Sequence, residues 1–201
     1  HWLKADNFTR LLTFLAQQPD AVDELVFFTS TTHAPLPLKE VARRAQRLAE
    51  IVPQAQQRGY RVGINVLTSM GHHEEDLPHS LVASWPRVTD PAGAISRGSF
   101  CPGSPELLDY VAQVYTLTAQ AHPDLIWIDD DVRLMGHMPI RVTCFCDDCI
   151  TRFNAEHGAS FTRPTLVAAM ADAPTTERDQ WRDRWLAHNR ALITGLLHVA
   201  T

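Results

Sequence analysis

Five stretches of the chain are predicted to be helical, either from apolar residues that recur every three or four positions or from a helix start signal. In the second stretch, Pro53 is expected to kink the helix and Gly59 to end it. The third begins at Ser104, Pro105 and Glu106, which supply a capping hydroxyl, a proline and an acid in the first turn. The five segments are residues 2–17, 38–59, 104–120, 150–157 and 177–199.

Three short apolar runs lie between these helices and predict β-strands at residues 25–29, 61–68 and 124–131. Leu125 to Ile128 is an uninterrupted apolar run, which predicts a strand buried on both faces, as in a parallel sheet. Trp127 would then belong to the core. The alternation of helices and strands predicts an α/β fold with parallel strands joined by right-handed crossovers.

The size of the chain bears on which α/β fold is expected. A complete (β/α)8 barrel typically has about 250 residues, and three strands cannot close one. We therefore expect residues 1–201 to form a single α/β domain, the N-terminal half of a (β/α)8 TIM barrel. An open doubly wound sheet is the alternative, but no glycine-rich phosphate loop follows any strand. Residues 69–103 lack periodicity and are expected to form a long loop.

Composition narrows the classes of partner. The chain is 45% hydrophobic with a formal charge of −5, and Lys4 and Lys39 are its only lysines. This charge pattern argues against nucleic-acid binding, because phosphate backbones require clustered basic residues. No apolar run is long enough for a membrane span, and the N-terminus does not resemble a signal peptide. The composition is compatible with small neutral or polyhydroxylated ligands. It is also compatible with assembly into a homo-oligomer.

Four cysteines carry the most specific chemical signal. Cys144, Cys146 and Cys149 fall within six residues, and Cys101 can supply a fourth thiolate to the same tetrahedral centre. This spacing predicts a structural zinc ion, with residues 132–149 as the zinc-binding loop. Disulfides, which would be strained between such close neighbours, and unrelated buried thiols are the alternatives. Reduced thiolates favour a reducing compartment, the cytoplasm.

Carboxylates end the third predicted strand at Asp129, Asp130 and Asp131. Active sites of (β/α) barrels lie at the carboxyl ends of their strands, so catalysis is one interpretation and a solvated acidic loop is the other. The histidine- and acid-rich residues 72–76 resemble a metal cluster, although such a segment is more often a solvated loop. His137 follows the three aspartates in sequence, so lining the same site and lying on the surface are its two interpretations.

Three segments together resemble the family-42 glycoside hydrolases, which are mostly β-galactosidases built on (β/α) barrels. These segments are residues 97–106, 127–131 and 144–153. In that family, an arginine four residues before a first cysteine contacts substrate, an Asp-Asn-Glu ends the fourth strand, and a Cys-x-Cys-x-x-Cys completes a zinc site.

The resemblance implies roles for particular residues. Arg97 would contact sugar hydroxyls, Asp130 would replace the substrate-binding asparagine, and Asp131 would replace the acid/base glutamate. The implied function is retaining hydrolysis of a glycosidic bond in a carbohydrate substrate, with a nucleophile on a later strand outside this chain. Aspartate is one methylene shorter than glutamate, so the alternatives are an inactive carbohydrate-binding barrel and a zinc-stabilised interaction module.

Overall fold

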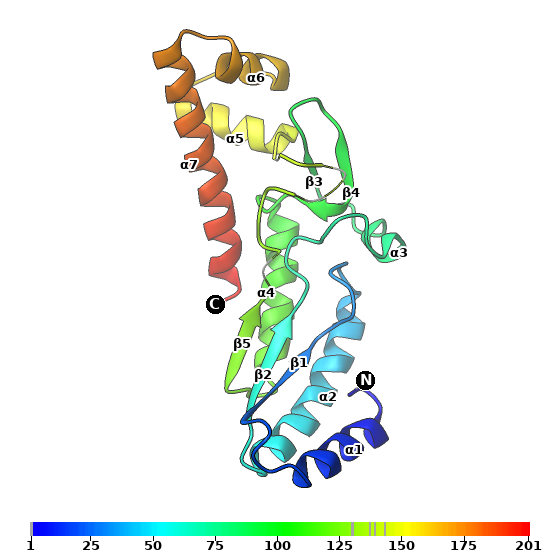
Figure 1. The fold of residues 1–201 in the computed structure, drawn as a ribbon. Coiled ribbons are helices and arrows are strands. Elements are labelled where there is room, and N and C mark those ends of the chain that lie inside the picture. The colour runs from blue at the N-terminus through cyan, green and yellow to red at the C-terminus, as the bar shows by residue number, and fades with distance from the viewer. Residues whose placement is uncertain (1, 130, 137, 139, 143) are drawn as a thin grey trace.

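The protein has an α/β fold that combines a small parallel sheet, a two-stranded hairpin and several helices (Figure 1). The computed structural model describes residues 2–129, 131–136, 138, 140–142 and 144–201. Within these residues, no helix is both long enough and apolar enough to cross a membrane. The elements in chain order are α1 (Ala5–Ala16), β1 (Glu24–Phe28), α2 (Leu38–Gln56), β2 (Arg61–Val66), α3 (Leu77–Ser80), β3 (Arg87–Thr89), β4 (Ile95–Phe100), α4 (Pro105–Ala119), β5 (Leu125–Ile128), α5 (Asp147–His157), α6 (Arg163–Ala171) and α7 (Thr175–Val199).

The three predicted strands form one parallel sheet in the order β1-β2-β5, which confirms the predicted α/β class. Helix α2 connects the first pair, and α4 precedes β5. Along one row of the sheet, Phe27 pairs with Ile64 and Ile64 with Ile126. These side chains face the helices, because they belong to the apolar clusters that α1, α2 and α4 complete.

The opposite face of the sheet is apolar but exposed. Val26, Phe28 and Trp127 are 39%, 49% and 52% accessible to solvent. The expectation that Trp127 belongs to the core is therefore wrong for this chain. Four consecutive apolar residues indicated burial on both faces, but helices cover one face, and alternation along the strand directs Trp127 to the other.

Several helix signals act as their chemistry predicts. The Ser104 hydroxyl accepts a hydrogen bond from the Leu107 amide at 3.2 Å, which caps α4. Helix α2 contains Pro53 and ends at Gln56, close to Gly59, whose φ of +90° suits glycine. Helix α6 was not expected, although Thr162 forms a capping box with Thr165 and a proline occupies the first turn. That start signal was present in the sequence.

Residues 69–103 are more ordered than a long loop. They contain α3 and the antiparallel hairpin of β3 and β4. A β-carbon at Gly98 would collide with the carbonyl oxygen of His73, and one at Gly71 would collide with that of Gly98. These two glycines therefore let the hairpin approach the segment that follows β2. Their contact is non-local, so the sequence pattern alone did not reveal it.

Helices α5, α6 and α7 form a second group beside the hairpin (Figure 1). Trp185 on α7 is 4% exposed, with its ring centroid 5.0 Å from that of Phe153 and 4.8 Å from that of Phe145. Phe145 lies between two of the cysteines. This aromatic packing connects α7 to the segment that carries the cysteine cluster.

Candidate metal centre and strand-end cluster

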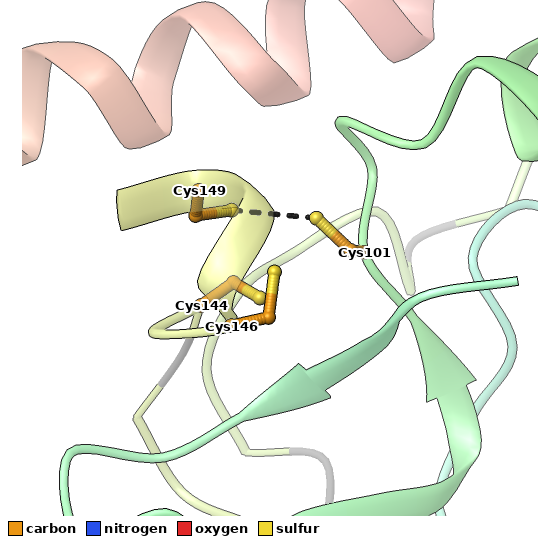
Figure 2. Close-up of side chains that lie close together, drawn as sticks. All are labelled: Cys101, Cys144, Cys146 and Cys149. Atoms are coloured by element: carbon orange, nitrogen blue, oxygen red, sulfur yellow. Dashed lines mark hydrogen bonds between the residues drawn. The ribbon is translucent and has the colours of Figure 1, made fainter. Parts of the chain in front are cut away.

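The four cysteines come together in a buried cluster (Figure 2). Cys101 directly follows β4, Cys144 and Cys146 precede α5, and Cys149 lies in its first turn. All four are at most 7% exposed, and their sulfur atoms lie within 4.8 Å of one another. The Sγ atoms of Cys101 and Cys149 are 3.3 Å apart.

Backbone contacts with β3 bring the two cysteine segments together. The Cys101 amide donates to the Pro86 carbonyl at 2.8 Å, and the Phe145 amide donates to the Thr89 carbonyl at 2.7 Å. Arg163, at the start of α6, donates from Nε to the Phe145 carbonyl at 2.7 Å. The short strand β3 thus connects both halves of the cluster, although it was predicted as loop.

This geometry fits a metal ion bound by four thiolates. In a tetrahedral site with metal–sulfur bonds of about 2.3 Å, neighbouring sulfur atoms lie about 3.8 Å apart. This value falls between the 3.3 Å of the Cys101–Cys149 pair and the 4.8 Å limit within which all four sulfur atoms lie. The thiols are free, and the 3.3 Å between Cys101 and Cys149 is far beyond a disulfide bond. With four protein ligands, no coordination position is left for substrate. The cluster can hold a metal ion that supports the fold.

The four thiols perturb one another's ionisation through hydrogen bonds. Hydrogen bonding with neighbouring thiols, Cys144 first, raises the pKa of Cys101, and hydrogen bonding with Cys101 raises the pKa of Cys149. The same contacts lower the pKa of Cys146, because its thiolate accepts from its neighbours. A bound metal ion stabilises the thiolate form at all four ligands.

A second group of polar residues lies at the carboxyl ends of the parallel strands. We call His33, His72, Glu75, Asp129 and Asp131 the strand-end cluster. His33 follows β1, His72 and Glu75 follow β2, and the two aspartates follow β5. Ligand-type atoms of these residues approach within 4.8 Å of one another in two overlapping groups that share His33. Parallel strands explain this convergence, because their carboxyl ends meet at one edge of the sheet.

Glu75 holds His33 in place through two contacts. Its Oε1 accepts from the His33 amide at 3.1 Å, and its Oε2 lies 2.8 Å from His33 Nδ1. Burial alone would raise the pKa of Glu75, but hydrogen bonds from His33 and Thr32 hold it below its ordinary value. Burial lowers the pKa of His72, and the charge of Asp131 opposes that shift.

The two described aspartates have different partners. Asp131 is 6% exposed, and its Oδ1 lies 2.5 Å from the Arg133 guanidinium. Asp129 Oδ1 accepts a hydrogen bond from the side-chain Nδ2 of Asn65 at 3.4 Å. Burial, assisted by the nearby Asp129 charge, raises the pKa of Tyr115. Both carboxylates thus contact polar side chains, and Asp131 is buried.

The structure describes most of the residues singled out in the sequence. Arg97 on β4 is exposed and lies 3.5 Å from Glu74, in the segment that also carries His72 and Glu75. Asp130 and His137 lie outside the described residues, so the predicted role of Asp130 in substrate binding stays a prediction. Sequence reasoning missed His33, although applying the strand-end rule to the first strand would have indicated it.

No protein family, curated protein or solved structure matches this chain. The described residues form an α/β protein with a buried four-cysteine cluster able to hold a metal ion and a separate histidine–carboxylate cluster at the carboxyl edge of a parallel sheet.

Proposed function

We propose that the four-cysteine cluster binds one zinc ion whose role is structural. Four thiolates in a closed tetrahedral arrangement are a ligand set that zinc favours in structural sites. The supporting observation is the burial of all four sulfur atoms between the hairpin and α5. The ion would join residues that are distant in the chain and would stabilise the loop that leads from β5 to α5.

Metal analysis tests this directly. Protein purified without added metal is expected to contain about one equivalent of zinc per chain, because four thiolates bind this ion tightly. Elemental analysis by mass spectrometry provides the measurement, and thiol titration of the native protein provides the control. Four freely reactive thiols with no release of metal would contradict the proposal.

We further propose that the chain is the N-terminal part of a (β/α) barrel. A doubly wound sheet carries helices on both faces, whereas the helices that cover this sheet occupy one face. The other face presents Val26, Phe28 and Trp127, apolar side chains of the kind that fill a barrel interior. Further strands would cover these residues and continue the sheet beyond β1 or β5.

In this barrel, we propose a glycoside hydrolase-like function with a carbohydrate substrate bound at the strand-end cluster. The observation that carries the proposal is the convergence of His33, His72, Glu75, Asp129 and Asp131 at the carboxyl edge of the sheet, where barrel enzymes hold their substrates. Carboxylates and imidazoles suit sugar hydroxyls, because they can accept or donate several hydrogen bonds.

The resemblance to family-42 glycoside hydrolases supplies the finer roles, which stay predictions. Asp131 would be the acid/base residue and Arg97 a substrate contact. Retaining hydrolysis needs a second carboxyl group about 5–5.5 Å away as nucleophile, which the resemblance assigns to a later strand. Support for Arg97 comes from its contact with Glu74, since the same segment contributes two residues to the strand-end cluster.

Replacing Arg97 tests the substrate site. If Arg97 contacts the sugar, Arg97→Ala in the intact protein is expected to lower kcat/KM on an aryl glycoside about tenfold or more, as loss of a hydrogen bond from a charged group predicts. Arg43→Ala is a matched control, because the two side chains are 58% and 56% exposed and each pairs with a glutamate. Equal effects of the two substitutions would contradict the assignment.

One observation favours a second candidate, a carbohydrate-binding barrel without activity. The Arg133 guanidinium lies 2.5 Å from Asp131 Oδ1, so an ion pair already engages the carboxyl group that would have to deliver the proton. Calorimetric titration with oligosaccharides, combined with the glycoside assay, separates the candidates. Binding without turnover indicates the inactive barrel, and turnover indicates the enzyme.

A further inference from the structure

Potential ligand atoms in the strand-end cluster face one another at separations longer than ordinary hydrogen bonds. His33 Nε2 lies 3.4 Å from Asp129 Oδ2 and 3.4 Å from Asp131 Oδ2, and His72 Nδ1 lies 3.5 Å from Asp131 Oδ2. Hydrogen bonds from nitrogen to oxygen are usually about 2.7–3.2 Å long. Two ligands about 2.1 Å from one tetrahedral metal ion lie about 3.4 Å apart. The spacing is therefore that of atoms around a shared cation.

Buried polar atoms near these contacts have no hydrogen bond from any residue that the structure describes. They are Asp129 Oδ2, Asn65 Oδ1 and the hydroxyl oxygen of Tyr115. Leaving a charged oxygen buried in this way is costly, so such an atom indicates a further group at the site. Asp129 Oδ2 is the atom that lies 3.4 Å from His33 Nε2.

The orientation of His33 points to a cation as that group. Glu75 Oε2 lies 2.8 Å from His33 Nδ1 and, in a neutral ring, accepts a hydrogen bond from Nδ1–H. The lone pair of Nε2 then faces the oxygen atoms of Asp129 and Asp131, an unfavourable arrangement unless positive charge lies between them. A histidine that binds a metal commonly donates its other ring N–H to a carboxylate, as His33 does to Glu75.

The charge of the site agrees with this inference. Glu75, Asp129 and Asp131 provide three carboxylates, and the guanidinium of Arg133 contacts one of them. A divalent cation would neutralise the two remaining charges. The described residues near the cluster thus provide both the ligands and the charge that a divalent ion requires.

We propose that His33, Asp129 and Asp131 bind one divalent transition-metal ion, and that Glu75 orients His33. An imidazole with two carboxylates suits Zn²⁺, Mn²⁺, Fe²⁺ or Co²⁺ better than Mg²⁺ or Ca²⁺, which prefer oxygen ligands alone. This centre differs from the four-cysteine cluster in its ligands and in its position at the end of the sheet.

The second ion deepens the proposed function at the same site. A cation at the carboxyl edge would bind hydroxyl oxygens of a sugar substrate and hold them in place. Asp131 would then be a metal ligand, and a different carboxyl group would supply the proton in hydrolysis. The binding of the ion itself does not depend on the substrate being a carbohydrate.

Metal titration of the intact protein tests the proposal. Protein that already contains one zinc equivalent is titrated with Zn²⁺ and, in parallel, with Mn²⁺ by isothermal calorimetry. One further equivalent is expected to bind. Asp129→Asn and His33→Gln are expected to weaken binding by more than about 100-fold, and Glu75→Gln by about 10–100-fold, the range for a carboxylate that orients a ligand. His79→Gln is the control, because this exposed histidine pairs with Asp76 and lies outside the cluster.

Retention of the first zinc equivalent and of the circular dichroism spectrum shows that each variant is folded. The proposal is overturned if wild-type protein binds neither ion, or if folded Asp129→Asn and His33→Gln bind them as wild type does. The glycoside assay separates the two proposals. Cleavage without uptake of a second ion would overturn only the cation site, whereas uptake without cleavage would overturn only the hydrolase.

Discussion

Cys149→Ser is expected to lower the stability of the protein by at least about 3 kcal/mol, because losing one thiolate weakens a metal site whose binding free energy contributes to folding. For a domain of this size, that loss corresponds to a melting temperature lower by about 6–12 °C. Cys149 is 1% exposed and lies where α5 meets the hairpin, so the loss affects the contact between these elements. Differential scanning calorimetry with zinc present provides the measurement.

Asp148→Asn is the matched control for this substitution. Asp148 is the exposed neighbour of Cys149 in the first turn of α5, where a carboxylate contributes about 0.3–1 kcal/mol through the helix dipole. Its loss should therefore change the melting temperature much less. A chelator should destabilise wild-type protein strongly and Cys149→Ser only weakly. If Cys149→Ser melts at the wild-type temperature, the cluster has no structural role.

Asp131→Asn is expected to reduce kcat on glycosides with poor leaving groups by about 10²–10⁴-fold if Asp131 is the acid/base residue. The amide keeps the shape of the side chain but cannot donate the proton. Aryl glycosides with activated leaving groups need little protonation, so their glycosylation step should suffer much less. Azide should then restore turnover by attacking the covalent intermediate. Steady-state kinetics on paired substrates provide the measurement.

The metal-ligand role predicts a different pattern for the same variant. Loss of a ligand should lower uptake of the second ion and reduce turnover of activated and unactivated glycosides to a similar extent. Asp124→Asn is the control, because Asp124 precedes the opposite end of β5 and accepts from the Val62 amide at 2.7 Å. It should affect stability but not kcat. Wild-type activity and wild-type metal binding of Asp131→Asn would exclude both roles.

Signals between residues close in sequence were sufficient to predict much of the fold and the cysteine cluster. Short apolar runs between amphipathic segments predicted β1, β2 and β5, because strand formation and side-chain alternation act over a few residues. Ser104 predicted the start of α4 for the same reason, since its hydroxyl caps an amide three residues away. Cys144, Cys146 and Cys149 lie so close in sequence that the chain brings them together almost unaided, and Cys101 was the only remaining thiol.

Other features depended on contacts between distant segments, so only the tertiary structure decided them. Trp127 is exposed because helices cover one face of the sheet, which a continuous apolar run in one strand cannot indicate. The hairpin within residues 69–103 depends on the close approach of Gly98 to His73. The strand-end cluster depends on the parallel register of three strands, which places His33 beside Asp129 and Asp131. The sequence by itself determined the types of side chain at the strand ends, whereas strand order and register determined which of them meet, because residues about a hundred positions apart become neighbours only when the sheet forms.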